Sequence, residues 1–133
     1  MTLNGLYEFA ELGGISVDCF SMNACECISI CDEGEYCIAI DPFRLCSSAD
    51  EKVKLAHEIG HCETGSFYNE YSPLDIRAKH ERRADAWAIK KLIPKDELNV
   101  AIKNGNINRY ELAEFFNVPE DFMQKALNYY KEV

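Results

Sequence analysis

Residues 55–62 read Leu-Ala-His-Glu-Ile-Gly-His-Cys and contain the pattern H-E-x-x-H, with its histidines at His57 and His61. Side chains four residues apart lie on one face of a helix, so the two imidazoles can bind a single zinc ion. Glu58 lies beside them and can act as the general base on a water at that ion. A shuffled chain of this composition would contain the pattern on the order of once in a hundred cases, so the surrounding sequence must supply a suitable context.

The sequence on both sides of the motif predicts the helix that this geometry requires. Ser48-Ala49-Asp50-Glu51 has the spacing of a capping box, and Gly65 is a typical residue at the end of a helix. We therefore expect a helix from Ser48 to about Glu63. Gly60 lies on the same stripe as the histidines, where the missing side chain allows a neighbouring backbone to approach closely.

A catalytic zinc ion needs a third protein ligand, which must come from outside the motif. The extended pattern H-E-x-x-H-x-x-G-x-x-H is not present, because Thr64 and Phe67 occupy its glycine and third histidine positions. The next helix is expected to begin at Ser72-Pro73, with Ser72 as the N-cap, and to run to Ile93 before Pro94.

One stripe of this second helix combines two carboxylates with small and apolar side chains, namely Glu81, Ala84, Asp85, Ala88 and Leu92. Carboxylates on a core-facing stripe are costly to bury unless a cation meets them. We therefore expect Glu81 to be the third zinc ligand and Asp85 to accept a hydrogen bond from a ligand histidine. The alternative is a surface ion pair between Arg77 and Glu81, which are four residues apart.

The region before the motif predicts one helix and a small sheet. Residues 3–12 have helical spacing and end at Gly13-Gly14. Residues 15–40 alternate with a period of about two, with a turn at Asp32-Glu33-Gly34-Glu35, and predict a small antiparallel sheet.

The region after the second helix is expected to be helical, over residues 95–104, over residues 108–116, and from Pro119 to near Tyr130. The fold class is therefore α+β. We expect a single domain of residues 1–133, in which residues 1–47 hold the first helix and the sheet, 48–94 the zinc-binding helices and 95–133 the helical C-terminal part.

The composition is that of an ordinary globular protein. The 133 residues fit one domain and include 47% hydrophobic and 28% charged residues, which excludes a disordered or fibrous chain. The net charge of −9 disfavours direct binding to nucleic acid or to an anionic membrane. The first eight residues lack the features of a secretory signal and no apolar run reaches 18 residues, so we expect a cytoplasmic protein without a membrane span.

The seven cysteines, at positions 19, 25, 27, 31, 37, 46 and 62, are expected to be free thiols. Cys25, Cys27, Cys31 and Cys37 suggest a second metal site, but they lack the paired C-x-x-C spacing, so packing in the core or the sheet is favoured. Cys62 lies about 100° from the ligand stripe on an ideal helix and is also expected to pack.

The chain resembles the ImmA/IrrE family of metallopeptidases, most densely over residues 50–94. The segments that carry the similarity are Leu55-Ala56-His57-Glu58-Ile59-Gly60-His61-Cys62, Gly65-Ser66-Phe67-Tyr68, Glu81-Arg82-Arg83-Ala84-Asp85-Ala86-Trp87-Ala88 and Leu92-Ile93-Pro94. The similarity is weaker over the predicted sheet and over the C-terminal helices.

The resemblance implies a zincin-like, gluzincin-type domain in which the small sheet packs on the motif helix. It implies one zinc ion bound by His57, His61 and Glu81, with Glu58 as the general base. It further implies a protein substrate, namely a helix-turn-helix transcriptional repressor of a prophage or integrated mobile element, whose cleavage relieves repression.

Tyr68, Tyr71 and His80 are candidates to stabilise the oxyanion or to contact the substrate, because they lie close to the site in sequence. A different interpretation is favoured for each of them. The two tyrosines are more often loop aromatics that pack over a cleft, and His80 points about 100° away from Glu81 on an ideal helix.

Two other functions stay open. The chain could be a non-catalytic zinc-containing module that sequesters a repressor or an antitoxin-like partner, or a metallohydrolase for small molecules. Direct contact with nucleic acid is disfavoured, although residues 110–119 are similar to half of a helix-turn-helix, because residues 108–133 carry three cations and five anions. Lys79, Arg83 and Lys90 are expected to form a solvated back face of the second helix.

Overall fold

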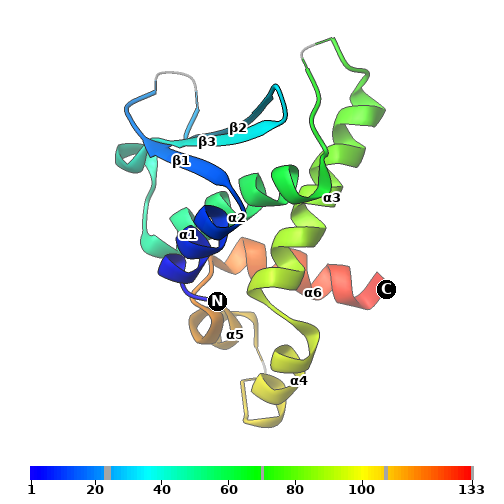
Figure 1. The fold of residues 1–133 in the computed structure, drawn as a ribbon. Coiled ribbons are helices and arrows are strands. Elements are labelled where there is room, and N and C mark those ends of the chain that lie inside the picture. Colours follow the sequence, from blue (N-terminus) through cyan, green and yellow to red (C-terminus); the bar gives the residue numbers. More distant parts are fainter. Residues whose placement is uncertain (23–24, 70, 107, 133) are drawn as a thin grey trace.

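The computed structural model describes residues 1–22, 25–69, 71–106 and 108–132. Within these residues the chain forms one three-stranded sheet and six α-helices (Figure 1), so the α+β class is confirmed. In chain order the elements are α1 (Leu3–Leu12), β1 (Ile15–Cys19), β2 (Cys27–Asp32), β3 (Glu35–Ile40), the 3₁₀ turn η1 (Pro42–Arg44), α2 (Ser48–Thr64), α3 (Leu74–Leu92), α4 (Lys95–Lys103), α5 (Arg109–Phe116) and α6 (Glu120–Glu132). None of the described helices is long and apolar enough to cross a membrane.

The sheet is mixed, and the expectation of an antiparallel sheet is wrong for β1. The strand order is β1-β3-β2, with β2 antiparallel to β3 and β1 parallel to β3. The β2–β3 hairpin turns at Glu33 and Gly34, which have φ angles of 51° and 80°, as a two-residue type I′ turn requires. Seven residues, 20–26, separate β1 from β2 in the chain, which is long enough for β1 to pair with the far side of β3.

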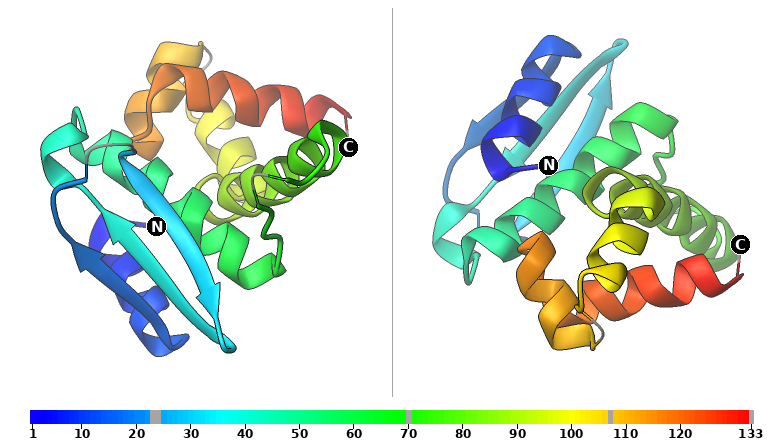
Figure 2. Two further views of the ribbon diagram at one scale, coloured as in Figure 1. Left: turned by 90° about the horizontal axis from the view of Figure 1, so that it is seen from above. Right: turned by 90° about the horizontal axis from the view of Figure 1, so that it is seen from below.

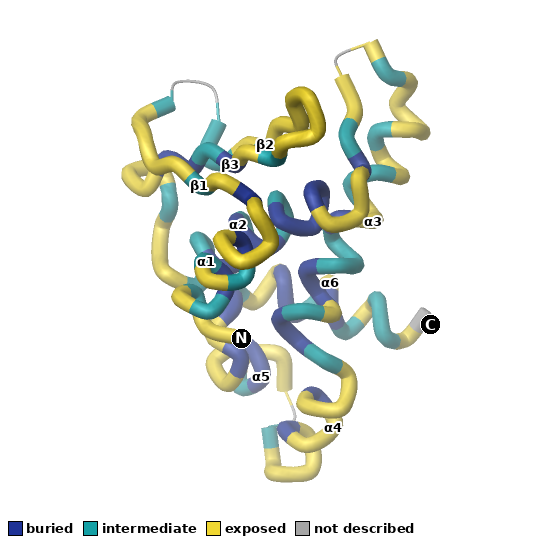
Figure 3. Tube along the Cα trace, viewed as in Figure 1, coloured by how far each residue is buried: buried dark blue, intermediate teal, exposed yellow. Residues whose placement is uncertain are grey.

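Alternation alone could not predict this order, because it indicates which segments are strands and not which strands are neighbours. β3 takes the centre because it carries Ile38 and Ile40, both at most 1% exposed. Ile38 and Ile40 lie with Ile15 of β1 on the face that packs against α1 and α2. The opposite face exposes Ile28 and Ile30, and β2 forms an edge of the sheet (Figure 3).

Helix α2 lies between the sheet and the later helices, as both views in Figure 2 show. The helix begins at Ser48, as expected, but its N-cap is Ser47 and not Ser48, and the Ser47 hydroxyl accepts the Asp50 N–H at 3.1 Å. Gly65 ends the helix in the left-handed conformation with φ 64°, as predicted. Helix α3 has Pro73 as its N-cap, and Ser72 instead accepts the Asn69 N–H, so the predicted Ser72 cap is wrong.

Helices α2 and α3 cross in direct backbone contact at Gly60 and Ala84. A Cβ atom added to Gly60 would lie 2.7 Å from the Ala84 carbonyl oxygen and 3.1 Å from its Cα. Ala84 and Ala88 are fully buried in the crossing. The prediction that Gly60 permits a close approach is therefore confirmed, and this approach brings the middle of α3 against the two motif histidines.

A buried lysine joins α2 to the C-terminal helices. Lys52 is 4% exposed, and its Nζ donates a hydrogen bond of 2.6 Å to the carbonyl oxygen of Phe116, at the end of α5. Burial lowers the pKa of this ammonium group. The negative end of the α5 dipole and the carbonyl hydrogen bond both favour the cation. Helix α5 ends in Asn117, which has a left-handed φ of 53°.

We predict that Gly60→Ala destabilises the fold, because its methyl group would force α2 and α3 apart. Overpacking of this kind costs about 1–3 kcal/mol, which exceeds the roughly 0.5–1 kcal/mol that alanine gains over glycine within a helix. Chemical denaturation of the metal-free protein measures the change in the free energy of unfolding.

Gly5→Ala in α1 is the matched control, because the nearest atom to its added Cβ is the flexible end of Met1. We expect this control to leave stability unchanged or to raise it slightly. Equal stability of the two variants would contradict the tight crossing.

Candidate metal centre

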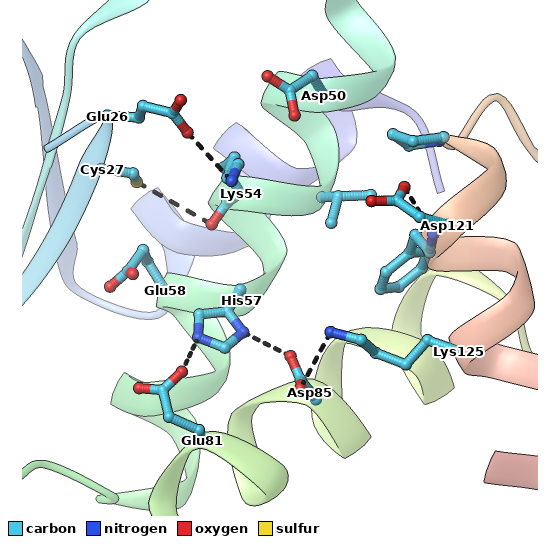
Figure 4. A pocket seen from close by; sticks show the side chains of 13 residues that line it. Glu26, Cys27, Asp50, Lys54, His57, Glu58, Glu81, Asp85, Asp121 and Lys125 are labelled. Carbon is cyan, nitrogen blue, oxygen red and sulfur yellow. Dashed lines mark hydrogen bonds and ion pairs between the residues drawn. The ribbon is translucent and has the colours of Figure 1, made fainter. Parts of the chain in front are cut away.

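The crossing of α2 and α3 brings together three side chains that can ligate a metal ion. His57 and His61 extend from one face of α2, and Glu81 extends from α3 towards them (Figure 4 shows His57 and Glu81). One ligand atom from each of the three lies within 4.8 Å of the others. In the part of the chain that the structure describes, no other group of three histidine, cysteine, aspartate or glutamate side chains meets this distance criterion.

Each histidine uses its Nδ1 atom in a hydrogen bond to an acceptor. His57 Nδ1 lies 2.8 Å from Asp85 Oδ1, and His61 Nδ1 lies 2.6 Å from the carbonyl oxygen of Ser66. A carbonyl oxygen and a carboxylate only accept, so both Nδ1 atoms carry the proton. In a neutral imidazole this leaves the lone pair on Nε2, which is the arrangement found in metal-ligating histidines.

The three lone-pair atoms converge. The two Nε2 atoms lie 3.2 Å apart, and the Glu81 carboxylate lies 2.8 Å from His57 Nε2 and 3.1 Å from His61 Nε2. Three electron-rich atoms this close repel one another unless a cation or a proton lies between them. Two imidazoles and a carboxylate are also the ligand set of one class of catalytic zinc sites, so the donor set fits the ion that the sequence predicts.

Asp85 connects the site to α6. Burial alone would raise the pKa of Asp85, but the hydrogen bond from His57 and the charge of Lys125 outweigh it and hold the pKa below its usual value. Burial by itself would lower the pKa of His57. The hydrogen bond to Asp85 and the negative charges of Asp85, Glu81 and Glu58 outweigh burial and raise this pKa. Lys125 Nζ lies 3.3 Å from Asp85 Oδ2. Asp85 therefore stays ionised, and its hydrogen bond to His57 Nδ1 orients the His57 ring.

Glu58 lies next to the histidines, on the wall of two adjoining cavities. The larger cavity, of about 410 Å³, lies between α2, α3 and the start of α6 and contains Glu58 with His57, Glu81 and Asp85 (Figure 4). The smaller one lies between α2 and the edge strand β2 and contains Glu58 with His61, Glu81 and Tyr68. Glu58 and Glu81 therefore border both cavities.

The three candidate oxyanion residues differ in position. Tyr68 donates a hydrogen bond of 2.8 Å from its hydroxyl to Glu81 Oε1, and this hydrogen bond raises the pKa of Tyr68. His80 stacks on the Tyr68 ring, with 6.2 Å between ring centroids, and its buried Nδ1 has no hydrogen-bond partner among the described residues. Tyr71 is 86% exposed and is not among the residues that line the two cavities.

Arg77, the alternative partner of Glu81, lies four residues before it on α3. Its Nε atom donates to the Ser72 carbonyl oxygen at 2.9 Å, and its guanidinium group lies 5.9 Å from the centre of the Tyr68 ring. Glu81 itself contacts both motif histidines and Tyr68.

Two groups at the site could not be identified from the sequence. The Ser66 carbonyl that orients His61 is a backbone atom, which any residue could supply at that point of the loop. Lys125 lies 40 residues from Asp85 in the chain, so no local pattern connects them. From the sequence, only the site residues that share one face of α2 or one face of α3 could be identified.

All seven cysteines are free thiols, and they differ in burial. Cys62 is buried, as expected, and burial raises its pKa to about 12. Cys31 and Cys37 lie in strands of the sheet, but they are exposed and not part of the core. Cys27 borders both cavities from β2.

Comparison with known proteins gives one family match. The family model Peptidase_M78, described as an IrrE N-terminal-like domain, matches residues 32–128. The matched region begins at the end of β2 and continues into α6, so it includes the three converging ligands, Glu58 and Asp85. No curated protein matches the chain.

We predict that the purified protein holds about one zinc ion and that His61→Ala and Glu81→Ala remove most of it, because a three-ligand site cannot easily lose one ligand. Elemental analysis after dialysis measures the metal content. His80→Ala is the control on the same helix and should retain the metal. Full occupancy in Glu81→Ala together with metal loss in His80→Ala would show that Glu81 is not the third ligand.

We predict that Asp85→Asn lowers zinc affinity roughly 10- to 100-fold, the range for side chains that orient a ligand histidine. Competition with a chelating dye measures the affinity, and Asp75→Asn, an exposed change on the same helix, should leave it unchanged. Wild-type zinc affinity in Asp85→Asn would remove Asp85 from the metal centre. A large loss of stability without zinc would indicate a structural ion pair instead.

Proposed function

This chain belongs to the Peptidase_M78 family of IrrE N-terminal-like metallopeptidases, and on that basis we propose that it is a zinc-dependent endopeptidase with a gluzincin-type site. The proposed zinc ligands are His57, His61 and Glu81, the proposed general base is Glu58, and the fold is proposed to be zincin-like. The proposed substrate is a helix-turn-helix repressor of a prophage or integrated element, and the proposed location is the cytoplasm.

One observation carries the proposal. The Nδ1 atoms of both motif histidines are committed to the acceptors Asp85 and Ser66, so both Nε2 lone pairs point at each other and at the Glu81 carboxylate. A structural role alone does not require two imidazole nitrogens and a carboxylate to converge on one point. The carboxylate of Glu58 borders the same cavities but is not one of the three converging groups.

When bound, zinc supplies a Lewis acid that activates water and polarises the scissile carbonyl group. Glu58 accepts the proton of the attacking water and later donates it to the leaving amine. The Tyr68 hydroxyl donates its one proton to Glu81 at the edge of the smaller cavity. By turning from Glu81 to the substrate, it can donate that proton instead to the oxygen of the scissile carbonyl as negative charge develops there. Asp85 keeps the His57 ring in place throughout.

The edge strand β2 favours an extended polypeptide as the substrate. Cys27, Ile28 and Ser29 of β2 form one wall of the smaller cavity, and His61 and Glu58 lie in the same cavity. β2 pairs with β3 along one edge only, so its other backbone edge can pair with a peptide. Peptide addition to a sheet edge supplies main-chain hydrogen bonds with little dependence on side chains.

The charge of the larger cavity is compatible with a DNA-binding protein as the substrate. Carboxylates dominate its lining, which contains Glu26, Asp50, Glu58, Glu81, Asp85 and Asp121 alongside Lys54 and Lys125. A repressor presents a cationic face to DNA, and opposite charges accelerate association of such a face with this cavity. The identity of the repressor rests on the family resemblance.

We predict that Glu58→Gln keeps zinc and the fold but abolishes proteolysis, because an amide cannot accept the water proton. The test is co-expression with a candidate helix-turn-helix repressor, with the length of the repressor read on a gel. Glu63→Gln, an equal change on the same helix, is the control and should cleave normally.

Two outcomes would overturn the proposal. Relief of repression by Glu58→Gln with an intact repressor would support a sequestering module instead of a peptidase. An uncut and fully active repressor in the presence of the wild-type protein and zinc would exclude this substrate.

A further inference from the structure

A basic groove lies between α3 and α6, on the far side of Asp85 from the metal centre. Its lining residues come from one stripe of each helix: Lys79, Arg82, Arg83, Asp85, Ala86 and Ile89 from α3, and Lys125, Asn128 and Tyr129 from α6. The spacing of three and four residues places each set on one helix face. The sequence predicted that Lys79 and Arg83 form a solvated back face, and both are exposed; α6 lies beside them at the groove.

The charge of the groove is opposite to that of the protein. Four cations and one carboxylate line it, in a chain with a net charge of −9. Lys79, Arg82 and Arg83 are exposed, and no carboxylate among the described residues pairs with them. Like charges three and four residues apart on a helix repel each other, so an anion in the groove would relieve this repulsion.

The floor of the groove is apolar. Ile89 is 1% exposed, and Ala86 and the ring of Tyr129 are partly buried beside it. A basic rim over an apolar floor suits a peptide that combines carboxylates with apolar side chains. A simple phosphate group would use the rim and leave the floor unused.

The groove is continuous with the catalytic cavity. Asp85 and Lys125 line both, and their ion pair of 3.3 Å stands at the boundary. A polypeptide that lies across the metal centre can therefore continue past Lys125 into the groove. The carboxylate-rich cavity and the basic groove would together fix the direction in which such a chain lies, because each prefers the opposite charge.

We propose that this groove is a docking site for an acidic segment of the protein substrate, adjacent to the segment that enters the catalytic cavity. The inference rests on the proposed peptidase function for the identity of the partner. A peptide is favoured over nucleic acid as the occupant, because the net charge of −9 opposes the approach of a long polyanion and the apolar floor offers nothing to a phosphate backbone.

The test is binding of a fluorescein-labelled peptide of alternating glutamate and leucine to the full chain, measured by fluorescence polarisation. The protein carries Glu58→Gln, so that cleavage does not interfere. We expect Arg83→Glu and Lys79→Glu each to weaken binding roughly five- to tenfold, and added salt to weaken it further.

Lys90→Glu is the matched control, because it makes the same charge change on an exposed position of α3 outside the groove. We expect it to change affinity less than twofold. Circular dichroism and zinc content of each variant verify that fold and metal centre are intact.

Several results would overturn the proposal: absence of peptide binding, equal weakening by Arg83→Glu and Lys90→Glu, or displacement of the peptide by a duplex DNA of similar charge at lower concentration. These results are separable from failure of the peptidase. Specific peptide binding by a chain that never cleaves would leave the groove standing and refute the proposed function. Cleavage of the repressor without specific peptide binding would support the proposed function and refute the docking site.

Discussion

Gly60 and Ala84 bring the backbones of α2 and α3 into direct contact, and the geometry of the candidate metal centre follows from that contact. Glu81 lies one turn before Ala84 on α3, and His57 and His61 lie on either side of Gly60 on α2. A methyl group at the crossing would move the Glu81 carboxylate away from both imidazoles. Gly60, which has no side chain, therefore sets the distance from Glu81 to His57 and His61.

Burial and charge are balanced around this crossing. The ligand face of α3 would be expensive to bury with two carboxylates and no cation. One Asp85 oxygen accepts a hydrogen bond from His57 and the other lies near Lys125. Glu81 accepts a hydrogen bond from the Tyr68 hydroxyl, and it faces the two imidazole Nε2 atoms at the point where a metal ion would meet all three groups. Each acidic group on this face has a donor or a cation within hydrogen-bonding distance, so the polar centre can lie directly beside the apolar core without leaving a buried charge unpaired.

The sequence was sufficient to predict what depends on a single helix. The ends of α2 and α3 follow from local capping and stop signals to within a residue or two, and the stripe through Glu81 and Asp85 follows from helical periodicity. What depends on the placement of two distant segments could not be predicted. The parallel pairing of β1, the Lys125 contact to Asp85 and the closeness of α6 to Arg83 arise from tertiary packing, which leaves no periodic signal in any one segment.

The Lys52 contact sets a lower limit on how far this architecture can be shortened. Lys52 lies in the same helix as the two motif histidines, yet its ammonium group is satisfied by a carbonyl 64 residues later, at the end of α5. A fragment that ended after α3 would retain every proposed metal ligand, but water would replace the Phe116 carbonyl at Lys52, and the part of the apolar core that α5 and α6 cover would be exposed. A natural or designed miniature of this fold must therefore keep these helices or replace the apolar side chains that they cover. Helices α5 and α6 contribute no proposed metal ligand, but they support α2, which contributes His57 and His61.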